Sequence, residues 1–173
     1  PSVPVVLGNI DTELYPVFVE KARDTDSPLH FPVEIRVTEK VAYEFGIKYI
    51  FDGQSIPLTH IDLPTFGPYQ EYNLLTVLHA VRILKDKKGL ELEWTAIRHG
   101  LENSLQISMF RGRYEIIHQN PLVIADAAHN PGGIRFFNPL FQNKSVHLHL
   151  VIGMVKGKDA DAILSLLPSN ATY

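Results

Sequence analysis

The sequence contains no cysteine, and no apolar run in it approaches the roughly 20 residues that a membrane-spanning helix needs. Without cysteine, a disulfide framework, a thiolate metal site and a cysteine nucleophile are excluded. The start, Pro1 to Pro4, has no initiator methionine and no signal-peptide pattern. Lack of cysteine fits a reducing compartment, so we expect a soluble cytoplasmic protein without a membrane partner.

Neither sign of charge is in excess, with 16 Lys and Arg against 19 Asp and Glu and a net charge of -3. This balance argues against the basic surface that nucleic-acid binding requires. Hydrophobic residues make up 45% of the chain, which disfavours extended disorder. A chain of 173 residues buries about 70% of its unfolded surface, enough for one large domain or two small ones. Because a β-like run has barely begun at Ala171–Tyr173, we expect an interior piece of a longer protein.

The first 107 residues predict an α/β unit that carries a β-hairpin. Apolar residues 5–7, a helix-spaced set beginning at Leu14, and a strand-like stretch at 29–37 predict a β-α-β start. Alternation from Tyr43 to Phe51 predicts one strand, a turn at Asp52-Gly53, and a return strand over 55–61. Two helices should follow. Their apolar positions are Leu74, Leu75, Val77, Leu78, Val81 and Leu84, then Ala96, Ile97, Leu101 and Leu105.

From residue 108 onward the pattern changes to strand, loop and helix. Strands are predicted at 114–117, 122–125 and 146–152, with helices over 136–141 and 160–167. Alternation of this kind predicts a mostly parallel, Rossmann-like sheet, so the fold class is α/β with units at 1–107 and 108–173. Ligands bind beyond the carboxyl ends of such strands, which directs attention to the loops at 126–133 and 153–159.

The first of these loops, Asp126 to Gly133, places an acid, an imidazole and an amide directly after a buried strand. Asp126 could accept hydrogen bonds from a ribose or position a cation, and His129 could bind a carboxylate or phosphate or transfer a proton. The following helix start would favour an anion. Capping and turn formation are the structural alternative. We interpret the loop as a functional site, because capping alone does not require this combination.

Two further side chains could contact a nucleotide. Arg113 precedes a strand, and its guanidinium could hold a phosphate through two hydrogen bonds, although a solvated turn is the alternative. Asn73 opens a helix, and its amide could read the edge of a base, with helix capping as the alternative.

Two further motifs resemble known kinds of site. The first is rejected, and the second is the less favoured interpretation. Residues 153–159 resemble a phosphate loop, but only three residues separate the glycines and Asp159 follows Lys158 where Ser or Thr is required. His147 and His149 share one face of a predicted strand and could serve a metal, but an exposed polar face is the favoured interpretation. A metal hydrolase built from these two histidines, His129 and Asp126 is kept as an alternative.

Four elements of the sequence resemble the folylpolyglutamate synthase / dihydrofolate synthase family of the Mur ligase superfamily. That family has Gly-Arg-x-Glu and Asp-Gly-Ala-His-Asn-Pro elements, matched at 112–115 and 126–131 except that Ala127 replaces glycine. Its Gly-x-His/Tyr-Gln-x-x-Asn helix start is matched at 67–73, and its Gly-Met and Lys-Asp elements within 153–159. The spacing agrees along nearly the whole chain.

The resemblance implies a partial ligase. It implies that residues 1–107 end a central ATP-binding domain and 108–173 begin a Rossmann-like C-terminal domain. The implied activity joins L-glutamate to a folate or dihydropteroate carboxylate through an acyl phosphate, with ATP and Mg²⁺ as cofactors. It also implies that Arg113 contacts ATP phosphates, Asp126 the ribose and Asn73 the adenine, and that His129 helps to hold glutamate or the acyl phosphate.

The family's phosphate loop and magnesium ligands lie upstream of the region matched here. We therefore expect the magnesium ligands outside this chain, no metal site within it, and no ligase activity from the chain alone. The full-length enzyme is expected to be a monomer that acts on small molecules. Another Mur-type amide ligase and a non-catalytic nucleotide-binding module remain alternatives beside the hydrolase.

Overall fold

A computed structural model describes residues 2–32, 34–54, 56–89, 91–143, 145–157 and 159–173, with the backbone alone at 87 and 88. The chain forms two compact units, residues 1–111 and residues 112–173, which we call the first and second units. The mixed α/β class predicted from the sequence is confirmed. No helix among these described residues has the length and apolarity that crossing a membrane requires.

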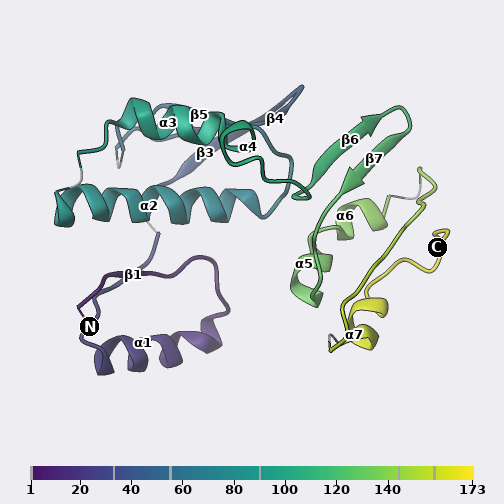
Figure 1. The fold of residues 1–173 in the computed structure, drawn as a ribbon, viewed down its shortest axis with the longest axis horizontal. Coiled ribbons are helices and arrows are strands. Elements are labelled where there is room, and N and C mark those ends of the chain that lie inside the picture. Colours follow the sequence, from purple (N-terminus) through teal and green to yellow (C-terminus); the bar gives the residue numbers. More distant parts are fainter. Residues whose placement is uncertain (1, 33, 55, 90, 144, 158) are drawn as a thin grey trace. The chain divides into compact units, whose positions relative to one another are not determined.

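The first unit begins with the predicted β-α-β arrangement (Figure 1). Strand β1 (Val5–Val6) pairs in parallel with β2 (Leu29–His30), and between them lie η1 (Thr12–Leu14) and α1 (Tyr15–Asp24). Each strand has only two residues, so much of the predicted strand at 29–37 is irregular, and Val33 lies outside the described residues.

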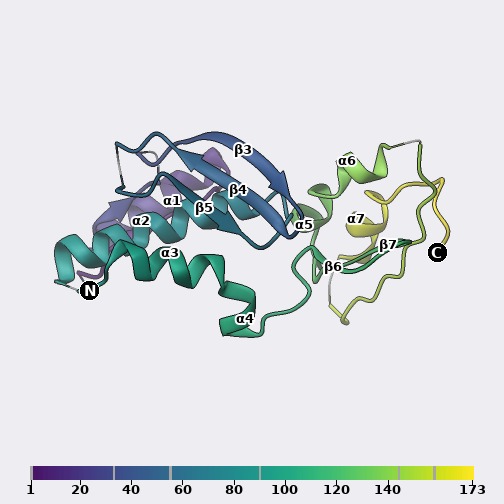
Figure 2. The same cartoon turned by 90° about the horizontal axis from the view of Figure 1, so that it is seen from above.

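A three-stranded antiparallel sheet follows, in the order β3-β4-β5 (Figure 2). Its strands are β3 (Val37–Tyr43), β4 (Gly46–Phe51) and β5 (His60–Leu63). The single strand predicted from Tyr43 to Phe51 is therefore wrong, because the chain turns at residues 44–45 and Tyr43 pairs with Gly46. The chain bends at residues 53–54, but the predicted hairpin turn at 52–53 is wrong, because β4 ends at Phe51 and the return strand starts only at His60; Ser55 lies outside the described residues.

The core of the first unit lies between this sheet and two helical segments. Helix α2 (Gln70–Lys88) contributes the buried Leu74 and Leu78 and ends at Gly89, whose φ of 62° suits glycine. Tyr49 and Ile61 of the sheet, which are 1% and 0% exposed, belong to the same buried cluster as these two leucines. Each buried apolar side chain contributes about 1.5–3 kcal/mol to stability.

The second predicted helix is present but divided at Asn103. It forms α3 (Trp94–Glu102) and α4 (Ser104–Ser108). Trp94, Ile97 and Leu101 of α3 pack against the core of the first unit, and Lys85 Nζ lies 6.0 Å from the centre of the Trp94 ring.

The second unit contains a hairpin and three short helices. Strands β6 (Glu115–Gln119) and β7 (Leu122–Ala125) are antiparallel, whereas a mostly parallel sheet was predicted. The reason is the connection: two residues join β6 to β7, and a parallel crossover needs a dozen or more. In the described part of the predicted strand 146–152, only an isolated parallel bridge forms, between His149 and Thr172.

The helices of this unit are shorter than predicted. The helix expected over 136–141 is present only as α6 (Asn138–Phe141), since Pro139 lies in the first turn of a new helix, and α5 (Pro131–Arg135) begins within the predicted loop. Helix α7 (Ala160–Leu164) is present, and the Asp159 side chain caps it by accepting a hydrogen bond from Ala162 N. Lys158 lies outside the described residues.

Candidate functional site

Two loops of the second unit, residues 112–114 and 126–130, are joined by hydrogen bonds. We call them the arginine loop and the histidine loop. Ala127 N donates to Gly112 O at 2.8 Å, and Tyr114 N donates to Asp126 Oδ2 at 2.7 Å. The antiparallel pairing of β6 and β7 places the start of one strand beside the end of the other, which brings the loops together. Arg113 and His129 are therefore carried by one connected piece of backbone.

Asp126 is the link between the loops. Its Oδ2 accepts from Tyr114 N, and its Oδ1 accepts from Ala128 N, both at 2.7 Å. Hydrogen bonds to a carboxylate are stronger than those between neutral groups. The half-buried Asp126 side chain thus positions the backbone on both of its sides, and any ribose contact would come in addition.

Tyr114 adopts an unusual backbone conformation, with φ at +52°. A bulky side chain seldom occupies this left-handed region, so the conformation requires support from its surroundings. Asp126 holds the amide, and the ring stacks on Phe137 with centroids 5.5 Å apart. Burial raises the pKa of the Tyr114 phenol, and the Asp126 charge raises that pKa further.

His129 is exposed on the histidine loop, at the residue before the cap of α5. Its Nδ1 lies 2.9 Å from Ala127 O. Because a carbonyl oxygen only accepts, this contact assigns a proton to Nδ1 and leaves Nε2 to contact a ligand. The predicted anion site at the helix start is not supported, since α5 has five residues and Asn130 Oδ1 accepts from Gly133 N at 2.8 Å.

Asp126 and His129 were predicted to lie at the carboxyl end of a parallel strand and to face a cleft rather than the core. The strand, β7, is antiparallel to β6, which corrects the first part. Asp126 is half-buried and His129 exposed, so neither side chain belongs to the core.

Arg113 and Asn73 lie in different units. Arg113 is half-buried in the arginine loop. Asn73 is exposed in the first turn of α2, where its Nδ2 donates to Gln70 Oε1 at 3.1 Å. The structure thus brings Arg113, Asp126 and His129 together in the second unit, while Asn73 is described with the first unit alone.

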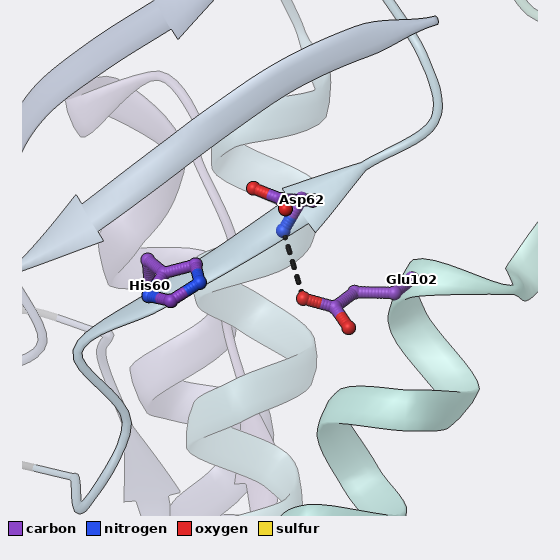
Figure 3. Close-up of side chains that lie close together, drawn as sticks. All are labelled: His60, Asp62 and Glu102. Carbon is purple, nitrogen blue, oxygen red and sulfur yellow. Dashed lines mark hydrogen bonds between the residues drawn. The ribbon is translucent and has the colours of Figure 1, made fainter.

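Sequence reasoning missed a charged group in the first unit, formed by His60 and Asp62 of β5 and Glu102 of α3 (Figure 3). A ligating atom of each lies within 4.8 Å of the others. Asp62 N donates to Glu102 Oε1 at 3.2 Å, the bond drawn in Figure 3. His60 and Asp62 share a strand face by their spacing, but nothing in the sequence pattern indicates Glu102 as their neighbour.

Two cationic side chains, those of Arg98 and Lys48, already contact this group. Arg98 Nε donates to Glu102 Oε1 at 2.8 Å, and an Arg98 amino nitrogen lies 2.7 Å from His60 Nε2. Lys48 Nζ lies 3.5 Å from Asp62 Oδ1. Mg²⁺ prefers an octahedron of oxygen ligands, and a guanidinium within the group repels it. The three residues therefore do not fit a magnesium site and form a charge network between sheet and helix.

The metal site of the alternative hydrolase is not assembled in the described residues. The His147 and His149 rings are in contact, with centroids 4.8 Å apart, and His147 Nε2 lies 2.8 Å from Thr172 Oγ1. Within that part of the chain, however, the group of three or more potential ligands does not include them, Asp126 or His129.

No family model matches the chain, but curated proteins and solved structures are similar to it. The curated relatives include folylpolyglutamate synthases and, at 33% identity over 50% of this chain, UDP-N-acetylmuramoyl-L-alanyl-D-glutamate–2,6-diaminopimelate ligase from Helicobacter pylori, which confirms the resemblance read from the motifs. The chain is 26% identical over 168 residues to folylpolyglutamate synthase from Lacticaseibacillus casei, covering 96% of this chain and 38% of that protein.

Solved structures agree with this relationship. A folylpolyglutamate synthase complex with AMPPCP and folate has a TM-score of 0.79 at 24% identity, over 99% of this chain and 41% of that one. Folylpolyglutamate synthase from Mycobacterium tuberculosis, complexed with ADP, has a TM-score of 0.72 at 25% identity, over 95% of this chain and 36% of that one. The chain thus spans about two fifths of the length of these three relatives.

Proposed function

We propose that this chain is part of an ATP-dependent ligase that adds L-glutamate to a folate or dihydropteroate carboxylate. The observation that carries the proposal is the joined pair of loops, in which Asp126 fixes the backbone beside Arg113 and His129. The similarity to a folylpolyglutamate synthase over 96% of the chain supports the same function.

The nucleotide contacts in this proposal are divided between the units. Arg113 binds ATP phosphates, Asp126 the ribose and Asn73 the adenine. An arginine suits the first role because charge accumulates on the transferring phosphoryl group and a guanidinium binds phosphate oxygens in pairs. Neighbouring structures that contain ADP or AMPPCP support a nucleotide here.

Two steps then form the amide. A carboxylate oxygen of the folate attacks the γ-phosphorus of ATP and ADP leaves. The amino nitrogen of L-glutamate attacks the acyl carbon, loses a proton, and phosphate leaves. With Nδ1 bonded to Ala127 O, His129 offers Nε2 to the glutamate carboxylate or the acyl phosphate. Mg²⁺ would neutralise phosphate charge during transfer, through ligands that we place outside this chain.

We further propose the arrangement of the whole enzyme. Residues 1–107 are the end of its central ATP-binding domain, and residues 108–173 are the start of its C-terminal domain. The full-length enzyme acts in the cytoplasm as a monomer on ATP, folate and L-glutamate.

The proposal is tested by titrating the ¹⁵N-labelled chain with ATP and Mg²⁺ while following backbone amide signals. We expect shifts in the arginine and histidine loops and at Asn73. Arg113→Ala should weaken ATP binding, whereas Arg135→Ala, at an exposed arginine of α5, should not. ATP that shifts neither loop, or binds equally well to the Arg113→Ala variant, contradicts the proposal.

The amino-acid substrate is tested by adding L-glutamate to the ATP-loaded chain, with D-glutamate and L-aspartate in parallel. The His129 ring signals should respond to L-glutamate and be lost in a His129→Ala variant. An equal response to all three amino acids would contradict a role for His129 in selecting glutamate.

A further inference from the structure

The first unit contains a surface cavity of about 190 Å³ that none of the proposed nucleotide contacts lines. Its walls are mostly aromatic and apolar, and they include the amide side chain of Asn9. The principal lining side chains are Tyr15, Phe31, Pro32, Tyr72, Leu75 and Asn9.

The cavity lies where a ligand is expected in an α/β fold. Gly8 and Asn9 come just after β1, and Phe31 and Pro32 directly follow β2, so two parallel strands end at it. Ligands of such sheets bind beyond the carboxyl ends of parallel strands. The tight contact of Gly8 with α2 closes one side, since a Cβ at Gly8 would lie 2.9 Å from Thr76 Oγ1.

The lining has the chemistry of a site for a flat ring. Tyr15 and Phe31 form a tilted aromatic pair, with centroids 5.2 Å apart and planes at 52°, and Tyr72 adds a third ring from α2. Among the described residues, no hydrogen bond engages the side chains of Asn9, Tyr15 or Tyr72. The cavity therefore combines aromatic faces with an amide and two hydroxyls that can bond the edge of a ring.

Its size restricts the ligand further. Pockets for drug-sized molecules hold about 300–1,000 Å³, so a cavity of about 190 Å³ takes a single ring system and not a whole nucleotide or folate.

We propose that this cavity binds one planar, fused nitrogen heterocycle, whose face contacts Tyr15, Phe31 and Tyr72 and whose edge bonds Asn9. Two sources present this chemistry: the purine of a nucleoside and the pterin ring of a folate. The proposal goes beyond the proposed function, because it concerns residues to which that function assigns no role.

The test is titration of the ¹⁵N-labelled chain with adenosine and, separately, with pterin, using ribose and L-glutamate as controls. We expect amide shifts at Gly8, Asn9, Phe31 and Tyr72 with at least one of the two ring compounds and with neither control. Response to adenosine alone identifies a purine site, response to pterin alone a folate-ring site, and response to both a site that accepts the shared ring chemistry.

Tyr72→Ala is the decisive variant, because Tyr72 is 42% exposed and its loss should leave the fold intact. Stacking on an aromatic side chain contributes enough that binding should weaken about tenfold, with a smaller loss for Tyr72→Phe. The matched control is Val77→Ala on the same helix, at a side chain that is 43% exposed and outside the cavity.

The proposal is overturned if neither ring compound binds at about 10 mM, if ribose or L-glutamate shifts the same amides, or if Tyr72→Ala binds like the Val77→Ala control. The outcome is separate from that of the ATP titration, since the arginine and histidine loops do not line the cavity.

Discussion

Asp126 has a structural role besides the nucleotide contact that we propose for it. The sequence pointed to it as a nucleotide ligand, and the structure shows its carboxylate accepting from two backbone amides, those of Tyr114 and Ala128. Because these amides lie in different loops, the carboxylate holds the arginine loop and the histidine loop together. Loss of Asp126 should therefore affect stability even without nucleotide.

We expect Asp126→Asn to lower the free energy of unfolding of the second unit by about 1.5–3 kcal/mol, since hydrogen bonds to a charged acceptor are lost and an amide cannot serve both donors. The measurement is the urea-dependent loss of backbone amide signals from residues 112–173. Asp24→Asn is the control, at a residue whose side chain is 58% exposed, and should change stability by less than about 0.5 kcal/mol. An equal effect of both variants would contradict the linking role.

Residue types and spacing predicted Asp126, His129 and Arg113 as site residues, and the structure joins the loops that carry them by hydrogen bonds. They did not reveal the left-handed backbone of Tyr114. That conformation depends on a carboxylate twelve residues away and on the Phe137 ring, and neither partner is visible in the local sequence. Glu102 was missed beside His60 and Asp62 for the same reason.

At the scale of elements, the misplaced hairpin shows how an alternating pattern can mislead. The chain turns after Tyr43 with two residues and resumes at Gly46, so the alternation keeps its phase from β3 into β4. Apolar residues therefore recur at every second position across the turn, and the two strands resemble one. Gly46 indicates where β4 begins after the turn, because a Cβ at this residue would lie 2.0 Å from Leu63 O of the neighbouring strand.

We expect Gly46→Ala to destabilise the first unit by at least about 3 kcal/mol, because the methyl group would push β5 away from β4. Gly100→Ala is the matched control. Gly100 lies in α3, and a Cβ added to it would meet nothing within 4 Å, so alanine should stabilise by about 0.5–1 kcal/mol. Thermal or urea unfolding measures both, and a tolerated Gly46→Ala would refute the close packing of these strands.

The central strand also makes the sheet sensitive to alkali. Burial raises the pKa of Tyr49 from 10.0 to about 12, with a further contribution from Glu71. Below pH 10 the phenol is neutral in both states and stability is unaffected. Between pH 10 and about 12 the unfolded chain loses the proton first, so stability falls as pH rises.

We expect about 1–1.5 kcal/mol to be lost between pH 9 and 11 through Tyr49. Urea unfolding at these two pH values, compared between wild type and Tyr49→Phe, gives the contribution of Tyr49 to the loss of stability. Tyr173→Phe, at a tyrosine that is 64% exposed, should retain the full wild-type dependence. A Tyr49→Phe variant that loses as much stability as wild type would disprove the assignment.

Strand pairing was the least predictable property of the elements. The sequence correctly indicated strands near 114–117 and at 122–125, but periodicity identifies a strand without naming its neighbour. Because only Asn120 and Pro121 connect the two strands, they pair as an antiparallel hairpin. Along 146–152 a β-like sequence alone did not produce a strand, since ladder hydrogen bonds need a paired segment.

At the scale of the whole molecule, motifs identified the relatives more securely than composition did. Length and charge allowed one domain or two and excluded little beyond nucleic-acid binding. Four short motifs in correct order led to the folylpolyglutamate synthases, which the comparison confirmed.

We expect the isolated chain to show no ligase activity. Phosphoryl transfer depends on positioning and on charge neutralisation by a phosphate loop and Mg²⁺, and the sequence contains no such loop. The assay is incubation with ATP, Mg²⁺, a reduced folate and labelled L-glutamate, with folylpolyglutamate synthase from L. casei as positive control. Incorporation at a rate typical of enzymes would show that the residues of this chain suffice.

The position of Trp94, packed on the core of the first unit, has a practical consequence. It is the single tryptophan of the chain, so light absorbed near 295 nm excites the first unit alone, and its emission spectrum reports solvent entry there. The second unit is silent at this wavelength. Tryptophan emission and the far-ultraviolet dichroism of the whole chain will therefore give coincident melting curves only if both units unfold together.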